Sequence, residues 1–367
     1  MSVDFSLQAV EGVRALSPYL IGKPIDELER ELGIKNIVKL ASNENPLGTP
    51  LSAIEAIRNT LSTAALYPDG SAFLLKKKLA EKLGCATDQI TIGNGSNELL
   101  ELIARVFLSP NDNTVLSRHT FIVYSLAANA LGAQVRVAPA INFAHDLSAM
   151  AALADKDTKV VFIANPNNPT GHILGITEIK EFLQTIPPHV LVVLDEAYHE
   201  YVEKLGYASG LTLLNQFSNL IVVRTFSKAY GLAGLRVGYS VSHPQVAQLL
   251  NRLRAPFNVN SLAMAAAAAV LDDADYLARS LALNRAGMAQ LEVGLTELGL
   301  PFIPSAGNFI AVDFGCDAMP LYLAFLQEGV ILRPIGVYEM PTWLRVSVGL
   351  SEQNAHFLER CKKILAQ

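Results

Sequence analysis

The sequence predicts an α/β fold, in which a mostly parallel sheet is covered on both faces by helices and is joined to a smaller α+β domain. Two observations support this fold class. From about residue 90 to 240, short runs of Val, Ile and Leu alternate with amphipathic segments, as in strands buried on both faces of a parallel sheet. Beyond about residue 260, a long helical stretch precedes strand-like runs and a last helix. The chain has 367 residues, 51% of them hydrophobic, which is enough for both domains.

Polar residues follow the predicted strands of the large sheet. In such sheets, ligands bind at the carboxyl ends of the strands, so these polar residues are the first candidates for a site. They occupy positions 94–97, 165–170, 195–198 and 227–228. The strands are predicted at 90–93, 114–117, 159–165, 189–198 and 219–228, and the first two lead into helices at 97–107 and 121–131.

The second domain is predicted from a helical stretch that ends near residue 297, followed by strands at 308–314 and 344–349 and a last helix from 351. The first forty or so residues do not fit the alternating pattern, so we expect them to pack with this domain. The predicted division is therefore a large domain over 48–255 and a small domain made of 1–47 and 256–367.

Composition excludes several classes of protein. The formal net charge of -5 offers no basic face to a nucleic acid. Cys85, Cys316 and Cys361 lie far apart, which favours reduced thiols over a disulfide framework or a zinc site, and no metal is expected. The N-terminus has no basic run before an apolar block, and the apolar run at 262–271 is about half of what a membrane span needs. We therefore expect a soluble, cytoplasmic protein.

Lys228 raises the main chemical question. It follows the apolar run at 219–223, near the end of a predicted core strand. Burying an ammonium group without a partner is costly. Lys228 is therefore either a solvated loop lysine or an amine whose pKa is lowered so that it can act as a nucleophile.

Three other motifs allow a structural or a functional interpretation. The turn GNGSNELLEL (93–102) could bind an anion at a helix N-terminus, or Ser96 or Asn97 could simply cap the helix. The segment NPNNPTG (165–171) is either a rigid loop or a holder of a small polar ring. Asp195 could cap a helix, or its carboxylate could face a protonated ring nitrogen with Tyr198 nearby.

Together these motifs indicate pyridoxal phosphate. A phosphate-binding turn, an aromatic residue, an amide, a buried aspartate, a lysine and a later arginine are the groups that this cofactor requires. The lysine forms a Schiff base, and the aspartate keeps the pyridinium nitrogen protonated so that the ring accepts electrons. Each motif alone could arise by chance, but their combination in this order favours the cofactor.

The motifs also resemble those of a known family. SNENPLG (42–48), YPDG (67–70), NPNNPTG, DEAY and TFSKAYGLAGLRVGY (225–239) are similar to fold type I pyridoxal-phosphate aminotransferases. LSPYL (16–20) and ILRPIGVYEMPTWLRVSVG (331–349) extend the resemblance to the histidinol-phosphate aminotransferase family, from about residue 14 to 350. The resemblance implies a mostly parallel seven-stranded sheet in the large domain.

The resemblance also implies roles around the cofactor ring. Lys228 would be the Schiff-base lysine and would shuttle the proton at the substrate carbon. Asp195 would pair with the ring nitrogen. Asn168 and Tyr198 would hydrogen-bond the phenolic oxygen of the ring, and Phe121 would stack on its face.

Further residues are implied for the phosphate and the substrate. Tyr67 would reach the cofactor phosphate of the neighbouring subunit, so the resemblance implies a homodimer with shared active sites. Arg345 and Arg333 would bind the anionic group of the substrate, and Tyr19 would close over it. Within one subunit, the cofactor phosphate would be held by Ser96, Asn97, Thr225, Ser227 and Arg236.

The implied activity transfers an amino group between L-histidinol phosphate and 2-oxoglutarate in histidine biosynthesis. The substrates would be a small amino donor and a 2-oxo acid, and arginine side chains suit both a phosphate and a carboxylate. The nearest alternative is an aromatic amino-acid aminotransferase, followed by a pyridoxal-phosphate lyase or decarboxylase. A non-catalytic regulator usually carries a separate DNA-binding domain, and no length is left for one.

Two residues differ from the family pattern. His119 stands where many relatives have a proline, and we expect it to be a surface loop histidine. Glu339 stands where relatives more often have glycine. Because it places a negative charge close in sequence to Arg333, it bears on the choice of substrate.

Overall fold

The computed structural model describes residues 3–14, 16, 22–202 and 207–366. Its main feature is a seven-stranded sheet with the strand order β2-β10-β9-β8-β7-β3-β4. The pairs from β9 to β4 are parallel, and β10 runs antiparallel to both of its neighbours. The predicted mostly parallel sheet is therefore confirmed. Its strands are β2 (Ile90–Gly93), β3 (Asn113–Ser117), β4 (Gln134–Ala138), β7 (Thr158–Ala164), β8 (Leu191–Asp195), β9 (Leu220–Thr225) and β10 (Gly238–Ser242).

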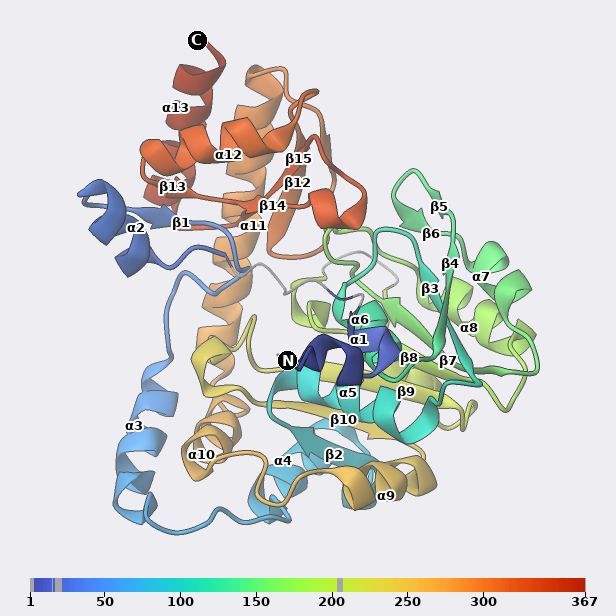
Figure 1. The fold of residues 1–367 in the computed structure, drawn as a ribbon. Coiled ribbons are helices and arrows are strands. Elements are labelled where there is room, and N and C mark those ends of the chain that lie inside the picture. The colour runs from blue at the N-terminus through green and yellow to red at the C-terminus, as the bar shows by residue number, and fades with distance from the viewer. Residues whose placement is uncertain (1–2, 15, 17–21, 203–206, 367) are drawn as a thin grey trace.

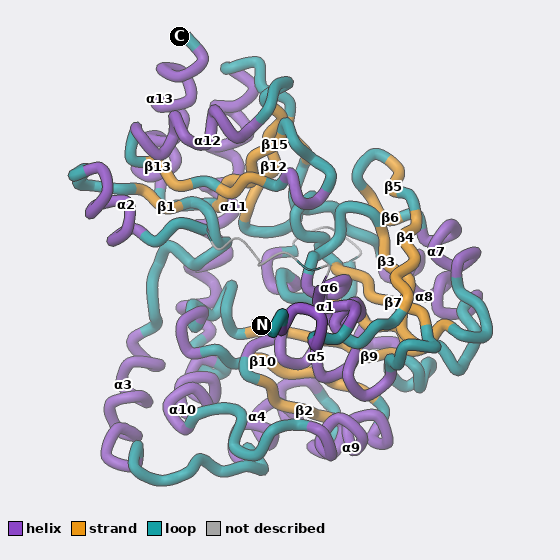
Figure 2. The backbone as a smooth tube through the Cα atoms, in the orientation of Figure 1, coloured by secondary structure: helices purple, strands orange, loops and turns teal. Residues whose placement is uncertain are grey.

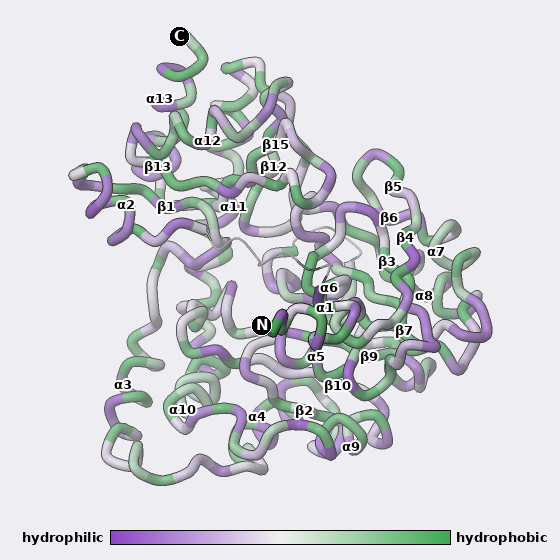
Figure 3. The backbone as a smooth tube through the Cα atoms, in the orientation of Figure 1, coloured by the Kyte–Doolittle hydropathy of each residue, from purple (hydrophilic) through white to green (hydrophobic). Residues whose placement is uncertain are grey.

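Helices cover both faces of the large sheet (Figures 1 and 2), and alternate residues of the central strands face opposite layers. Ile221 and Val223 of β9 pack toward one layer, and Leu220 and Val222 pack toward the other. Both sets are fully buried, so the central strands are hydrophobic along their length (Figure 3). The first layer contains α5 (Gly95–Phe107), α6 (Val123–Ala130) and α9 (Pro244–Leu253), and the second contains α7 (Leu147–Leu153) and α8 (Ile176–Thr185).

A second, smaller sheet has the order β11-β12-β15-β14 and is antiparallel throughout. Its hydrophobic core joins this sheet to two C-terminal helices and to Leu40, near the start of the chain. The predicted α+β part is confirmed. Its elements are β11 (Phe302–Ile303), β12 (Phe309–Asp313), β13 (Val330–Ile331), β14 (Arg333–Pro334), β15 (Trp343–Ser347), α12 (Ala318–Gln327) and α13 (Ser351–Leu365), and β13 pairs with β1 (Val38–Lys39).

The long helix α11 (Ala274–Glu297) leads from the large sheet to the small one (Figure 1). The alanine-rich helix α10 (Ser261–Val270) precedes it and packs against the core of the large sheet, where Ala263 and Ala267 are fully buried. The division at residues 48 and 255 stays a prediction. The other helices are α1 (Glu11–Arg14), α2 (Ile25–Leu32), α3 (Leu51–Thr60) and α4 (Phe73–Leu83), and β5 (Ala140–Ile141) and β6 (Ala144–His145) form a hairpin.

Within the described ranges, none of the helices has the length and apolar character required to cross a membrane. The three cysteines are free thiols: Cys361 is buried, Cys85 is half-buried and Cys316 is exposed.

Candidate active site

A cavity of about 260 Å³ lies at the carboxyl edge of the large sheet, where the small sheet faces it. Among the described residues, one predicted site residue does not line it. Tyr67 is 83% exposed elsewhere on the surface, and Tyr19 lies outside the described residues. The cavity brings together all the others: Ser96, Asn97, Phe121, Asn168, Asp195, Tyr198, Thr225, Ser227, Lys228, Arg236, Arg333 and Arg345.

The alternation of strand residues determines which side chains reach the cavity. On β8 and β9, Asp195 and Thr225 continue the rows that face α5 and α6, and both line the cavity. Glu196, which follows Asp195, and Arg224, which precedes Thr225, point to the opposite face and form a buried ion pair there. Asp195 and Thr225 therefore line the cavity from two strands whose ends are linked by an ion pair on the opposite face of the sheet.

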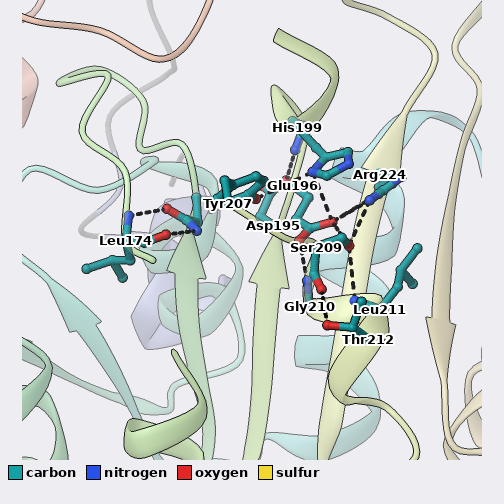
Figure 4. Close-up of polar contacts among 12 residues, drawn as sticks. Leu174, Asp195, Glu196, His199, Tyr207, Ser209, Gly210, Leu211, Thr212 and Arg224 are labelled. Carbon is teal, nitrogen blue, oxygen red and sulfur yellow. Dashed lines mark hydrogen bonds and ion pairs between the residues drawn. The ribbon is translucent and has the colours of Figure 1, made fainter. Parts of the chain in front are cut away.

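Figure 4 shows this supporting cluster around Glu196. Its Oε2 accepts hydrogen bonds from Arg224 Nε at 3.0 Å, Arg224 Nη2 at 2.8 Å and Ser209 Oγ at 2.7 Å, and its Oε1 accepts one from the Gly210 amide at 2.7 Å. A fully buried carboxylate is tolerated because its charge is paired and its lone pairs are used. The cluster fixes the ends of β8 and β9 relative to each other.

Lys228 is half-buried and lines the cavity. Its Nζ donates to the Ser42 carbonyl at 3.1 Å and lies 5.7 Å from the centre of the Tyr198 ring. Burial, reinforced by the positive charge of Arg345, lowers the pKa of Lys228 to about 7. The structure therefore favours the nucleophile over the solvated loop lysine, because the amine lines the cavity and part of it is neutral near pH 7.

Asp195 is held from two sides. Its Oδ2 accepts a hydrogen bond from the Tyr124 hydroxyl at 2.8 Å, and its Oδ1 accepts one from the Ala197 amide at 3.1 Å. Burial raises the pKa of Asp195 to about 6, and the bond from Tyr124 opposes this shift. A buried carboxylate of this kind is prepared for a cationic partner inside the cavity.

The Tyr198 hydroxyl is fixed by Asn43. Asn43 Nδ2 donates to this oxygen at 2.9 Å, while its Oδ1 accepts from Ser347 Oγ at 3.0 Å. Ser347 lies on β15 of the small sheet, and its Oγ also accepts from the Asn43 amide at 2.8 Å. Three distant segments of the chain thus set the position of one phenol.

An anion site lies where α5 begins. Ser96 and Asn97 occupy its first turn, so its free amides and positive dipole end face the cavity. Gly95 has φ of +77°, and a Cβ at that position would collide with the guanidinium of Arg236. Arg236 Nη1 donates to Ser227 Oγ at 3.2 Å. The close approach of backbone, hydroxyl and guanidinium donors suits a phosphate group.

The asparagines of the 165–171 segment divide into two kinds. Asn165 bonds both polar groups of Leu174, and Asn167 donates to the His119 carbonyl at 2.9 Å and to Thr170, so these two amides stabilise the loop. Asn168 instead lines the cavity, and its Oδ1 accepts from Arg345 Nη1 at 2.5 Å. The loop interpretation therefore holds for Asn165 and Asn167, whereas the binding of a ring by Asn168 stays a prediction.

Arg333 and Arg345 are directly opposite each other on β14 and β15, so both point to the same face of the small sheet. Only 7% of Arg333 and 6% of Arg345 is exposed. Like charges in such a pair repel unless an anion lies between them. Arg345 is further fixed by its bonds to Asn168 and, at 2.8 Å, to the Ala41 carbonyl. This end of the cavity is suited to a second anion.

The two residues that differ from the family pattern lie together outside the cavity. His119 lies in the turn after β3, as expected of a loop residue, but it is half-buried and its Nδ1 donates to the Tyr338 carbonyl at 2.6 Å. Glu339 forms an exposed ion pair with Arg118, whose Nε is 2.8 Å from its Oε2. The charge of Glu339 is therefore directed at Arg118 rather than at Arg333.

Sequence reasoning missed two residues that fix the site. Tyr124 is fully buried and stacks on Phe162 with ring centres 4.9 Å apart, but in the sequence it is one aromatic residue within an apolar helix. Asn43 belongs to the quoted motif SNENPLG, but the sequence does not predict its φ of +52° or its burial. The only signal for Tyr124 was its position three residues after Phe121, on the same face of a helix.

Comparison with known proteins agrees with this geometry. The model of the family "Aminotransferase class I and II" matches residues 35–360. The chain is 58% identical to histidinol-phosphate aminotransferase 2 of Pseudomonas fluorescens over all of both chains, and 57% identical to the enzyme of that name from Pseudomonas aeruginosa over 99% of both. The crystal structure of histidinol-phosphate aminotransferase from Sinorhizobium meliloti in complex with pyridoxal-5'-phosphate superposes with a TM-score of 0.89 at 29% identity, over 97% of this chain and 98% of that one. The chain therefore belongs to the class I and II aminotransferase family, as a relative of its histidinol-phosphate aminotransferases.

Proposed function

We propose that this protein is a pyridoxal-phosphate-dependent aminotransferase that moves an amino group between L-histidinol phosphate and 2-oxoglutarate in histidine biosynthesis. The observation that carries the choice of substrate is the buried pair Arg333 and Arg345 opposite the anion site of the cofactor. Among the described lining residues, the charged groups are Lys228, Arg236, Arg333, Arg345 and Asp195. This excess of positive charge suits a cavity that holds two anions at once.

The residues fit the cofactor along its whole length. Its phosphate would lie at the start of α5 against Ser96, Asn97, Thr225, Ser227 and Arg236, and its ring between Phe121 and the carboxylate of Asp195. When bound, pyridoxal phosphate supplies an aromatic ring that accepts electrons from the substrate carbon. Asp195 would accept a hydrogen bond from the protonated ring nitrogen, and Asn168 and Tyr198 would donate toward the phenolic oxygen.

Lys228 would perform the proton transfers. With a pKa lowered to about 7, its Nζ exists in both protonation states near neutral pH, so it can take a proton from the donor carbon and return one. The Ser42 carbonyl, 3.1 Å away, orients this amine beside the Tyr198 ring. Between reactions the same amine would hold the cofactor through its aldehyde carbon, with the aldehyde oxygen released as water.

The two arginines would accept both substrates in turn. Histidinol phosphate has no carboxylate, so its phosphate dianion is the group that Arg333 and Arg345 would bind. In the second half-reaction, 2-oxoglutarate would place a carboxylate on Arg345, because planar guanidinium groups bind both anions. The hydrogen bond that Arg345 donates to Asn168 would link the position of the substrate to the position of the ring.

We further propose a homodimer in which Tyr67 completes the cofactor site of the neighbouring subunit. Tyr67 lies in a segment rich in exposed apolar side chains, where Leu66 is 70%, Phe73 is 62% and Leu74 is 71% exposed. Such a concentration of exposed apolar groups marks an interaction surface, and a two-fold dimer would bring each Tyr67 to the other subunit. Sedimentation should give a dimer at working concentration, and a fully active monomer would contradict this arrangement.

The proposed site of action is the cytoplasm. The pathway substrates are small charged metabolites, and the three free thiols suit a reducing compartment. Fractionation of cells that express the protein at natural levels would test this.

Steady-state kinetics with four amino donors tests the substrate assignment. With 2-oxoglutarate as acceptor, histidinol phosphate should give a higher kcat/KM than phenylalanine, tyrosine or aspartate. A preference for phenylalanine or tyrosine would instead favour an aromatic amino-acid aminotransferase. Release of CO₂ without amino transfer would favour a decarboxylase.

A further inference from the structure

The segment 254–258 connects the anion site of α5 to the loop that carries Tyr67. It lies between α9 and α10, and in sequence it is far from both of the features that it contacts. At one end, Asn258 Nδ2 donates to Glu98 Oε2 at 2.6 Å and to the Ile92 carbonyl at 3.2 Å. The Asn258 carbonyl in turn accepts from Asn94 Nδ2 at 3.1 Å. The segment is thus bonded to the strand, the turn and the helix that form the anion site.

Glu98 fixes the turn that precedes α5. Its Oε2 accepts a hydrogen bond from the Asn94 amide at 2.5 Å as well as the bond from Asn258. The carboxylate therefore satisfies a backbone donor just before the helix, and leaves the donors at Ser96 and Asn97 to face the cavity. Glu98 acts within its own subunit.

Arg254 holds the other end of the network. Its Nη1 donates to Asn258 Oδ1 at 2.5 Å, and its Nη2 donates to the Gly70 carbonyl at 2.7 Å. Gly70 ends the YPDG loop that begins with Tyr67. A single guanidinium therefore spans the distance from the anion-site network to the backbone of this loop.

Phe257 supplies a second contact to the same loop. It has φ of +58°, and its ring stacks on Tyr67 with centroids 4.7 Å apart and an angle of 23° between the planes. A Cβ at Gly70 would lie 3.4 Å from this ring, so the loop and Phe257 pack closely. Tyr67 is nevertheless 83% exposed, and it does not line the cavity of its own subunit. The 254–258 segment therefore supports a side chain that lies outside the cavity of its own subunit.

We propose that Arg254 is a positioning residue that acts in trans: it fixes Tyr67 for the cofactor phosphate of the partner subunit. This inference rests on the dimer of the proposed function. Glu98, at the opposite end of the same network, acts in cis on the anion site of its own subunit. The network thereby connects the phosphate sites of the two subunits through one half-buried arginine.

Arg254→Met tests the role of the guanidinium. It should raise the dissociation constant of pyridoxal phosphate by about tenfold, the effect of one charge-assisted hydrogen bond. Arg254→Lys should recover part of the loss, because an ammonium can still donate to the Gly70 carbonyl. The matched control is Arg252→Met on the exposed face of α9, which should leave the constant unchanged.

Hybrid dimers separate action in trans from action in cis. A chain with Lys228→Ala and a chain with Arg254→Met, carrying different tags, are co-expressed and the heterodimer is purified. Its Lys228-bearing site receives Tyr67 from the chain that keeps Arg254. Borohydride reduction over a series of cofactor concentrations, followed by mass spectrometry, should then show attachment with wild-type affinity, and turnover should be about half that of the wild-type dimer.

The opposite results would overturn the proposal. Attachment that keeps the tenfold weaker affinity would place the effect of Arg254 in its own subunit. The corresponding hybrid of Tyr67→Phe with Lys228→Ala tests the dimer itself. If cofactor affinity recovers in this hybrid but not in the hybrid that carries Arg254→Met, the role of Arg254 is refuted. If neither hybrid recovers, the shared-site arrangement fails and the assignment of Arg254 fails with it. A hybrid of Glu98→Gln with Lys228→Ala should show no recovery, because Glu98 acts in cis.

Discussion

The ends of the cavity that we propose for the cofactor and for the substrate are built in different ways. At the cofactor end, Asp195, Thr225 and Lys228 follow adjacent parallel strands, so the topology of one sheet places them together. At the substrate end, Arg345 is fixed by bonds to the Ala41 carbonyl and to Asn168, which come from the beginning of the chain and from the large sheet. One end follows from a single fold motif, and the other depends on how the two sheets meet.

This difference implies that the two ends have different functions. The cofactor is common to both half-reactions, so its binding residues belong on the rigid sheet edge. The substrate changes from a phosphate to a carboxylate within one catalytic cycle, so its residues belong where separate segments converge. Substitutions at the cofactor end should affect all substrates alike, whereas substitutions at the substrate end should discriminate among them.

Lys228→Ala should have the largest effect, because Lys228 lies between the two ends. The variant should lose turnover with every donor, since both the covalent attachment and the proton transfer disappear, and proton transfer alone contributes roughly 10²–10⁴-fold. Intact-protein mass spectrometry after borohydride reduction should detect no attached cofactor. Transamination that persists in this variant would refute the proposed mechanism.

Arg236→Met sharpens the comparison at the cofactor end. Loss of charge-assisted bonds to the phosphate should weaken cofactor binding by about ten- to a hundredfold. With saturating cofactor, any fall in kcat/KM should be equal for histidinol phosphate, phenylalanine and 2-oxoglutarate. A loss confined to the phosphorylated donor would mean that Arg236 binds substrate instead.

Asp195→Asn should reveal the cost of the buried carboxylate in the protein without cofactor. Burial raises the pKa of Asp195 from 3.8 to about 6, so the protonated form favours folding. Its contribution to stability is fully present below about pH 4 and is lost as the pH rises through 6. The asparagine does not titrate, so the variant should gain stability relative to wild type by up to about 3 kcal/mol between pH 4 and pH 7.

Urea unfolding of both apoproteins at pH 4.5 and pH 7 measures this difference. Each comparison is made at one pH, so the titration of other groups cancels. A stability difference that stays constant between the two pH values would show that Asp195 has an ordinary pKa and is only a turn residue.

Glu339→Gln should have the smallest effect. The ion pair between Arg118 and Glu339 is exposed, and such pairs contribute little, so kcat/KM should change by less than about threefold with any donor. The effect should also shrink at high salt. A loss of more than about tenfold that is specific to histidinol phosphate would return Glu339 to the substrate site.

Much of the fold could be predicted because its strands are nearly continuous apolar runs. The strand β10 was missed because GYSVS contains glycine and serine and overlaps the end of the lysine motif. It forms a strand because it pairs with β2 on one side and β9 on the other. This pairing depends on tertiary packing and not on local composition.

The cofactor end of the site could also be predicted, since each residue follows a predicted strand. Tyr124 could not, because its bond to Asp195 depends on how α6 packs over the sheet. The bond from Asn43 to Tyr198 likewise depends on Ser347, about three hundred residues away in sequence. Side chains that support a site from another domain leave no local pattern.

Single-turnover kinetics of Arg333→Met tests the central claim most directly. With cofactor bound, the variant is mixed separately with histidinol phosphate, with phenylalanine and, in its aminated form, with 2-oxoglutarate. If Arg333 binds the phosphate of the substrate, kcat/KM for histidinol phosphate should fall by about ten- to a hundredfold, while that for phenylalanine should change by less than about threefold. Arg345→Met, in contrast, should impair both half-reactions. An equal loss for histidinol phosphate and phenylalanine in Arg333→Met would contradict a phosphate site at the substrate end and favour the aromatic amino-acid aminotransferase.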